Sequence, residues 1–172
     1  MVTPDGRFAY IANASFPEVD AIDTTTYQLT TIPTGGRSRR IYISLAGDRV
    51  YATNYHDDAV FAIDTATQQL IATIPVGAHC QRVVITRDGT KAFVQNGWSN
   101  TVSAIDTATH TVSATLPTGD HPWTILATPD DMTLYVCNGT DTTLTVIDIP
   151  SLTVSATIAN VGSHPFDLAF GP

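Results

Sequence analysis

The feature that most constrains the fold is a sequence repeat with a period of about 42 residues. The segments AIDTTT, AIDTAT, AIDTAT and VIDIPS share an Asp; AYIAN, VYATN, AFVQN and LYVCN all end in Asn. A third set, TIPTG, TIPVG, TLPTG and IANVG, ends in Gly. All three sets recur together four times, which predicts four equivalent structural units. The shared positions are Asp23, Asp64, Asp106 and Asp148, then Asn13, Asn54, Asn96 and Asn138, and Gly35, Gly77, Gly119 and Gly162.

Each unit contains four short runs rich in Val, Ile, Thr, Tyr and Phe, separated by turn residues. In the third unit these runs span residues 82–86, 92–95, 101–105 and 111–116. Such runs predict β-strands, and the gaps between them are too short for crossover helices. Four antiparallel strands in about 42 residues are typical of one blade of a β-propeller. We therefore predict an all-β propeller of four blades, with residues 1–172 as a single domain.

The repeat also resembles a known family. The stretch VYATN, four further residues and AVFAIDTATQQLIATIPVG, at residues 50–77, resembles the YVTN-type repeat of bacterial surface-layer-like β-propellers. The resemblance covers essentially the whole chain and implies blades around a central channel, usually more than four. Related propellers include binding modules, lactonase-like enzymes and streptogramin lyase-like enzymes, so the resemblance does not select one activity.

The two ends of the chain match parts of the same innermost strand of a blade. Residues 1–4 match its tail, and residues 166–170 match its start. Pairing of residues 166–170 beside residues 8–13 would close a four-bladed ring and remove two exposed strand edges. Two alternatives stay open: two chains could form one eight-bladed ring, or the chain could be part of a longer propeller. The expected state is a monomer or a homodimer.

Composition excludes some classes of partner. Sixteen acidic residues against eight basic ones give a formal charge of −8, so binding to nucleic acid through phosphate contacts is not expected. No apolar run reaches the roughly 18 residues of a membrane-spanning helix, which argues against membrane insertion. Nothing at residues 1–3 resembles a signal peptide. The expected compartment is the cytoplasm if the chain is complete, and the cell surface or exterior if it is a trimmed family member.

Comparing the four copies separates scaffold from candidate site. The turns resembling TPDG and DTAT are nearly the same in every copy, so we assign their acidic residues to turn formation. In a blade of a propeller, the loops after the second and fourth strands lie together on the face opposite to these turns. These loops differ between copies and carry four of the five histidines and both tryptophans. Loops on a rigid scaffold are where binding residues gather, so this face is the candidate site.

The most specific pattern on that face is Arg37, His79, His121 and His164, each two positions after a repeat glycine. In a closed ring they would surround the channel mouth. Three neutral imidazoles could hold a single divalent metal ion, with one position left for water or substrate, while Arg37 would suit an anionic substrate. The same three histidines are the candidate catalytic residues. The alternative is that this loop position only tolerates His, because repeat copies drift together.

Aromatic side chains could form an apolar floor for a ligand on the same face. They are Trp98, Trp123, Phe166, Phe16 and Tyr55. Packing between blades is the alternative role for them. Cys80 could act as a nucleophile beside a histidine, or be a half-buried thiol with no role in chemistry. The candidate substrate-binding residues are Arg37, Arg39, Tyr55, His56, Trp98, Trp123 and Phe166.

Three functions are therefore compatible with the sequence. The first is recognition of a small molecule or a protein partner at the His/Arg/aromatic face. The second is an enzyme using the same face, as a metal-assisted or acid/base lyase or lactone hydrolase. The third is a structural, surface-layer-like module in which the variable loops have no role.

Overall fold

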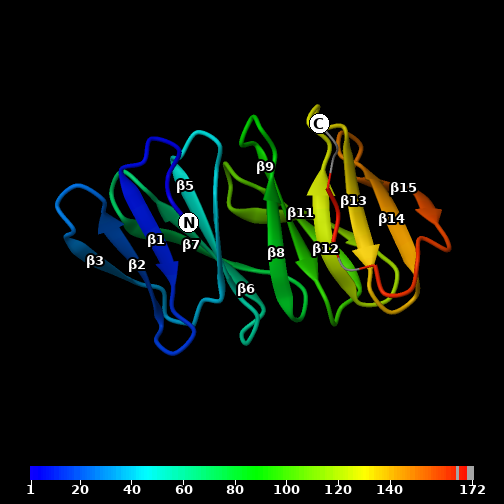
Figure 1. The fold of residues 1–172 in the computed structure, drawn as a ribbon, viewed down its shortest axis with the longest axis horizontal. Helices are drawn as coiled ribbons and strands as arrows, with labels where there is room; N and C mark the ends of the chain where they lie inside the picture. The colour runs from blue at the N-terminus through cyan, green and yellow to red at the C-terminus, as the bar shows by residue number, and fades with distance from the viewer. Residues whose placement is uncertain (166, 170–172) are drawn as a thin grey trace.

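The computed structural model describes residues 1–165 and 167–169, and within them it contains fifteen strands and no helix. The strands form four antiparallel sheets, which we call blades 1 to 4 in chain order (Figure 1). Blade 1 has β1 (Phe8–Ala12), β2 (Glu18–Asp23) and β3 (Leu29–Pro33); blade 2 has β4 (Arg40–Ile43), β5 (Arg49–Asn54), β6 (Ala59–Asp64) and β7 (Gln69–Pro75). Blade 3 has β8 (Cys80–Ile85), β9 (Lys91–Asn96), β10 (Thr101–Asp106) and β11 (Thr111–Pro117); blade 4 has β12 (Pro122–Ala127), β13 (Thr133–Asn138), β14 (Thr143–Asp148) and β15 (Thr153–Ile158).

This arrangement confirms the predicted all-β propeller blades. In blades 2 to 4 the strands follow one another in chain order across the sheet. Blade 1 has three strands, and a single bridge between Val2 and Ala9 stands where the other blades have their first strand. The repeat in the sequence is thus a repeat of antiparallel meanders.

The burial of each strand follows from its place in the blade. The middle strands β5, β6, β9 and β10 are buried on both faces, because a neighbouring blade covers each side. The outer strands β7 and β11 alternate between exposed and more buried residues. Continuous apolar runs in the middle and alternation at the rim are what stacked sheets require.

The hydrophobic core lies between the blades rather than in one central mass. Tyr10 and Val19 of blade 1 pack with Val50 and Phe61 of blade 2. Separate clusters of the same kind join blade 2 to blade 3 and blade 3 to blade 4. Each blade therefore depends on its neighbours for burial of its apolar side chains, as expected for a repeat architecture.

The predicted turns are present. Gly6 and Gly89 adopt positive φ angles of 74° and 71°, which the tight turns between first and second strands require. At the end of the third strand of blade 3, the Asp106 carboxylate accepts hydrogen bonds from the backbone N–H groups of Ala108 and Thr109, at 3.0 and 2.9 Å. These contacts explain why the Asp recurs in every unit.

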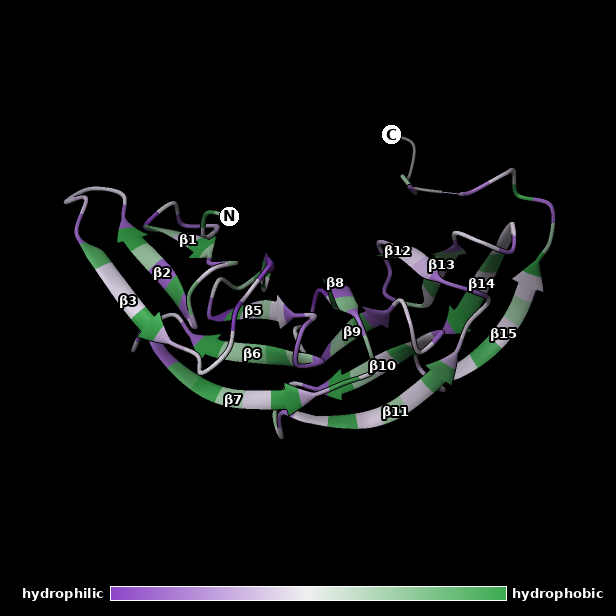
Figure 2. Cartoon of the chain, turned by 90° about the horizontal axis from the view of Figure 1, so that it is seen from below, coloured by the Kyte–Doolittle hydropathy of each residue, from purple (hydrophilic) through white to green (hydrophobic). Residues whose placement is uncertain are grey.

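The four blades form an open arc (Figure 2). The outermost strands β3, β7, β11 and β15 follow its convex side, and β8 and β12 lie on the concave side. Among the described residues, no strand pairing joins blade 1 to blade 4, and residues 167–169 belong to no strand. The predicted ring closure is therefore not observed, and Phe166 and Phe170, on which it depends, lie outside the described residues.

Two kinds of loop meet on one face, as predicted. The backbone N–H groups of Gly97 and Trp98, after β9, donate to the carbonyls of His79 and Ala78, before β8. Gly139, after β13, donates in the same way to the carbonyl of His121. We call this side, formed by the loops after the second and fourth strands, the loop face, and the opposite side the turn face.

Candidate functional site

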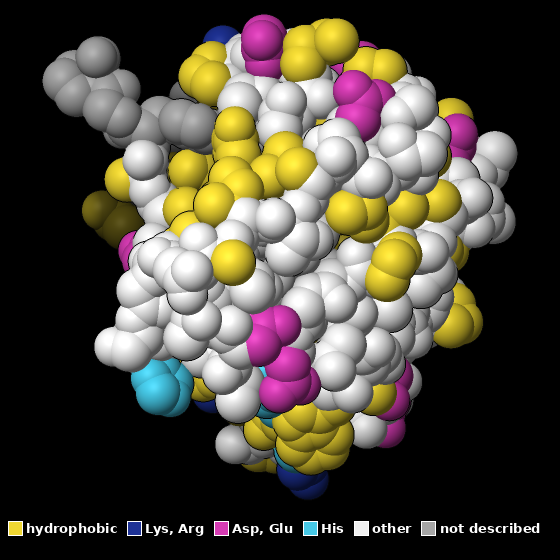
Figure 3. All heavy atoms as spheres, turned by 90° about the vertical axis from the view of Figure 1, so that its right-hand side faces the viewer, with side chains coloured by type: hydrophobic (Ala, Val, Ile, Leu, Met, Phe, Trp, Pro, Cys, Tyr) yellow, Lys and Arg dark blue, Asp and Glu magenta, His cyan; other side chains and the backbone are white. Residues whose placement is uncertain are grey.

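The loop face carries four of the five histidines and three of the seven arginines of the chain. Figure 3 shows the visible histidines at the lower end of the molecule, with a Lys or Arg side chain beside them. Most of the candidate residues predicted from the sequence come from loops on this face.

The loop after β5 is held by the asparagine that ends the strand. The Asn54 Oδ1 accepts hydrogen bonds from the backbone N–H groups of His56 and Asp57, at 3.0 and 3.2 Å. The Asn54 amide nitrogen donates to the Asp57 carboxylate at 2.7 Å. Asn54 is 1% exposed, so the turn that presents Tyr55 and His56 has a rigid base.

The repeat histidines occupy an unusual backbone conformation. His79, His121 and His164 have φ angles of 58°, 52° and 56°, in the left-handed region that costs a side-chain-bearing residue about 1 kcal/mol or more. The side chains of Asp58 and Asn100 accept hydrogen bonds from the backbone N–H groups of His79 and His121, at 2.8 and 2.9 Å. The histidine side chains are thus placed by fixed loops.

The first hollow on the loop face contains four predicted substrate-binding residues. Arg37, Arg39, Tyr55 and His56 line a cavity of about 80 Å³. The guanidinium carbon of Arg39 lies 4.8 Å from the centre of the Tyr55 ring, a cation–π contact. Within the described residues, neither arginine forms an ion pair with a carboxylate. The hollow is therefore cationic and has an aromatic wall.

A stack of rings extends from this hollow across the loop face. The centroid of the Tyr55 ring lies 4.1 Å from that of the His56 ring and 5.0 Å from that of the His79 ring, which it meets edge-on. The His79 ring is stacked on Trp98 at 4.4 Å with an interplanar angle of 7°. Trp98 is nevertheless 70% exposed, so the far side of its indole is open to a ligand.

The surroundings of His79 favour the neutral form of its ring. Burial lowers its pKa below the ordinary value, and the nearby His121 and Arg39 lower it further. The Gln81 amide nitrogen lies 2.9 Å from the His79 Nδ1. With the amide as donor, Nδ1 accepts and the ring proton is on Nε2. His79 can therefore donate one hydrogen bond without carrying charge.

The second hollow lies in blade 4 and is larger. His121, Trp123 and His164 line a cavity of about 300 Å³ with Gly139, Thr140 and Pro165. The centroids of the His121 and Trp123 rings are 5.4 Å apart. The structure thus divides the predicted site between two hollows, with Phe166 outside the described residues.

The structure does not support the predicted metal ring. Among residues 1–165 and 167–169, no group of three or more His, Cys, Asp or Glu side chains is arranged to hold a metal ion. His79 contacts the first group of rings, while His121 and His164 line the second hollow. The described residues therefore do not bring the three imidazoles together as one set of ligands, and the metal ring stays a prediction.

Cys80 is not an activated nucleophile. Its side chain is fully buried in the cluster between blades 2 and 3, and burial raises the pKa of its thiol to about 12. The thiol donates hydrogen bonds to the carbonyls of Asn54 and Ala59, both at 3.3 Å. Of the two interpretations, the inert thiol is the one that this geometry favours.

Some residues of the site were not predicted. Gln81 fixes the His79 ring, and Ser38 and Ala14 complete the lining of the first hollow. Asp58 and Asn100 hold the histidine loops. A signal for the last two was available, since they occupy corresponding positions in units 2 and 3 and both side chains carry an acceptor oxygen. Nothing in the sequence marked Gln81.

Comparison with known proteins agrees with this architecture. A family model described as YNCE-like beta-propeller matches residues 83–172, which contain blade 4 and most of blade 3. The chain belongs to the YNCE-like β-propeller family. This membership supports a propeller repeat in general, while the narrower YVTN resemblance stays a prediction. A comparison with curated proteins finds no match.

Solved propeller structures resemble this YNCE-like chain over most of its length. Hydrazine synthase of Kuenenia stuttgartiensis superposes with a TM-score of 0.82 at 25% sequence identity, over 91% of this chain and 47% of that one. The dihydro-heme d1 dehydrogenase NirN, in complex with DHE, superposes with a TM-score of 0.77 at 15% identity, over 92% of this chain and 36% of that one. The chain therefore spans less than half the length of either protein. The described residues of this YNCE-like chain contain no helix able to cross a membrane.

Proposed function

We propose that the chain recognises a small anionic molecule with a ring, bound at the loop face in the hollow formed by Arg37, Arg39, Tyr55 and His56. The observation that carries the proposal is a pair of arginines in this hollow that form no ion pair with a carboxylate of the described residues, in a chain whose formal charge is −8. Guanidinium groups bind planar oxyanions with two parallel hydrogen bonds. The exposed indole of Trp98 offers a surface on which a ring can stack.

Repeat geometry supports a binding role for these residues. Arg37 and Arg39 belong to one of four corresponding loops, and the other three have no arginine at either position: His79 and Gln81, His121 and Trp123, and His164 and Phe166. A purely structural loop residue would be expected to recur, as the turn aspartates do. The cationic pair is therefore specific to one loop and suits one ligand orientation.

The test is isothermal titration calorimetry of the full chain with phenyl phosphate and with phenol. We expect the phosphate to bind and the neutral phenol to bind at least about tenfold more weakly. The double variant Arg37→Gln, Arg39→Gln should lose about tenfold or more in affinity for phenyl phosphate. Arg7→Gln, which removes an arginine in contact with Phe8 outside the loop face, is the matched control and should bind as the parent does. Equal binding of phosphate and phenol, or an unchanged double variant, would contradict the proposal.

An enzyme at the same face is the second candidate function. The observation that favours it is the presence of two imidazoles, from His121 and His164, around the larger hollow beside Trp123. One of them could move a proton in a lyase or lactone hydrolase reaction. Under this alternative, His121→Ala and His164→Ala abolish turnover of a lactone substrate while leaving the fold intact. A binding role alone predicts no product from any variant or from the parent chain.

A further inference from the structure

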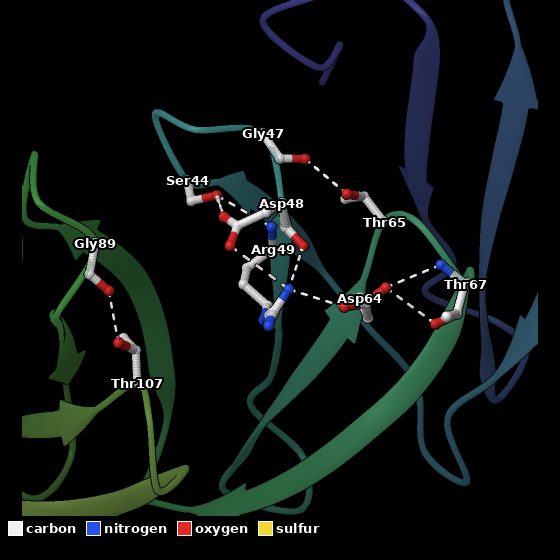
Figure 4. A network of polar contacts seen from close by, with 9 residues as sticks. All are labelled: Ser44, Gly47, Asp48, Arg49, Asp64, Thr65, Thr67, Gly89 and Thr107. Atoms are coloured by element: carbon white, nitrogen blue, oxygen red, sulfur yellow. Dashed lines mark hydrogen bonds and ion pairs between the residues drawn. The ribbon is translucent and has the colours of Figure 1, made fainter.

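A separate cleft lies between blades 2 and 3 on the turn face, far along the sheets from the loops. Its volume is about 250 Å³, and its lining includes Asp48, Arg49, Tyr51, Arg87 and Asp88. Figure 4 shows the Arg49 side chain between Asp64 of its own blade and the Gly89–Thr107 pair of the next blade. None of the residues predicted from the sequence as a site lies here.

The cleft contains hydrogen-bond donors without partners. The Tyr51 side chain is 1% exposed, and its hydroxyl has no hydrogen-bond partner among the described residues. Within the same part of the chain, the Arg87 guanidinium forms no ion pair. Arg49 uses one guanidinium nitrogen, Nη1, to bind the Asp64 carboxylate and the Asp48 carbonyl, both at 2.8 Å. A buried donor without a partner is costly, so Tyr51 indicates that an acceptor belongs in the cleft.

The two aspartates that line the cleft already accept hydrogen bonds from neighbouring residues. The Asp48 carboxylate accepts a hydrogen bond from the Ser44 hydroxyl at 2.7 Å. The Asp88 carboxylate accepts from the Thr86 hydroxyl at 2.7 Å and from the Thr90 backbone N–H at 2.9 Å. What remains unpaired is mostly donors, and donors match an oxyanion. With Asp64, which pairs with Arg49, three carboxylates stand against two guanidinium groups, so the affinity for a simple anion is expected to be weak.

An apolar hollow adjoins the cleft and shares Arg87 with it. This apolar hollow has a volume of about 360 Å³, and its lining includes Tyr42, Ile43, Leu45, Val83 and Ile85 from blades 2 and 3. Leu45 is 64% exposed, so its side chain is uncovered. The cleft and the apolar hollow together offer hydrogen-bond donors at one end and an apolar wall at the other, with Arg87 between them.

One residue of the cleft departs from the repeat. Arg87 stands where the other three units have Pro4, Leu45 and Pro129. Tyr51 follows the repeat, because units 1 and 4 have Tyr10 and Tyr135 at the same position. Unit 3 has the fully buried Phe93 there, so the fold does not require a hydroxyl at this position. Arg87 therefore adds a donor that the corresponding turns of the other units lack.

We propose that this interblade cleft binds an organic carboxylate with an apolar body. The carboxylate accepts hydrogen bonds from the Tyr51 hydroxyl and the Arg87 guanidinium, and the apolar body lies against Ile43, Leu45 and Val83. A planar carboxylate matches a guanidinium in geometry, and a buried phenol adds a directional third donor. This site is independent of the loop-face site proposed above.

The test is a titration of the nitrogen-15-labelled chain with hydrocinnamate, followed by amide NMR, with hydrocinnamyl alcohol as the neutral analogue. We expect hydrocinnamate to shift amide signals of residues 43–51 and 85–90, with a Kd in the range of about 1 to 10 mM. The alcohol should bind at least about tenfold more weakly. Tyr51→Phe and Arg87→Gln should each weaken hydrocinnamate binding by about fivefold or more, and Arg37→Gln should leave it unchanged.

Three results would overturn the proposal. The first is the absence of amide shifts up to about 20 mM hydrocinnamate, well above the expected Kd. The second is amide shifts confined to the loop face, and the third is equal affinity for the acid and the alcohol. The two variants are complementary, because Tyr51→Phe copies a residue the repeat already uses and Arg87→Gln changes an exposed side chain. If both keep the parent's amide spectrum and the parent's affinity, the cleft does not hold the carboxylate.

Discussion

Two buried tyrosines at one repeat position carry a hydroxyl that the packing does not require. Tyr10 and Tyr51 occupy corresponding positions in blades 1 and 2, are each 1% exposed, and have hydroxyls with no partner among the described residues. Burial raises the pKa of both, for Tyr51 to about 12, so both are neutral at pH 7. Phe93 fills the same position in blade 3 without a hydroxyl. The hydroxyl is therefore dispensable for packing.

This comparison predicts the effect of exchanging the two residue types. Tyr10→Phe removes an unpaired buried hydroxyl, so the free energy of unfolding should stay the same or rise by up to about 1 kcal/mol. Phe93→Tyr buries a new hydroxyl and should lower it by about 1 to 3 kcal/mol. Urea unfolding of the two variants and the parent measures both effects. A loss of more than about 1 kcal/mol in Tyr10→Phe would show that the hydroxyl is satisfied in solution.

At the scale of the structural elements, each blade is held at its turns by carboxylates that accept backbone N–H groups. The pKa values of Asp23, Asp64 and Asp106 lie below the ordinary value, chiefly because the backbone N–H groups of Thr26, Thr67 and Thr109 donate to them. A carboxylate hydrogen-bonded in this way is stabilised in its charged form. The turns after the third strands of blades 1 to 3 thus share one dependence on the ionisation of an aspartate.

The repeated turns predict a loss of stability in acid. Because the native pKa values of these aspartates are depressed, the unfolded chain takes up protons first, and stability falls as the pH drops below about 4. His79 acts in the same direction from about pH 6.5 downward, since its native pKa is also lowered. The urea concentration at the midpoint of unfolding should decrease steadily as the pH is lowered from neutral to acidic. In the Asp64→Asn variant this decrease should be smaller than in the parent. A midpoint that rises on acidification would contradict this.

Much of each element could be predicted from the sequence, because strand runs and turn residues depend on local chemistry. The predicted runs of unit 3 correspond to β8 to β11, and the glycines of the tight turns have the expected positive φ. The loop face was also predicted correctly as the meeting place of two loop types. The stack of Tyr55, His79 and Trp98 was not, because it depends on the rotation between adjacent blades and on left-handed loop residues. The Tyr51 cleft was missed for the same reason, since its donors come from two blades.

At the scale of the whole molecule, the described arc has a sheet face at each end that no other described blade covers. On blade 1 this face includes Ile11, 45% exposed, and Leu29, 60% exposed; on blade 4 it includes Ile158, 44% exposed. Ala52, which corresponds to Ile11 in blade 2, is fully buried against blade 1. The end faces therefore have the composition of interblade surfaces, which bury apolar side chains wherever a neighbour is present.

These faces predict that the isolated chain associates with itself. Each uncovered face can bury its apolar side chains against another copy, so sedimentation velocity should show an average mass that rises with concentration. Ile11→Lys places a charge in the blade 1 face and should shift the chain toward the monomer. Phe16→Lys changes a side chain that is 60% exposed but lies in a loop, and it should leave association unchanged. A parent chain that stays monomeric at every concentration, or an Ile11→Lys variant that associates as the parent does, would show that the end faces do not drive assembly.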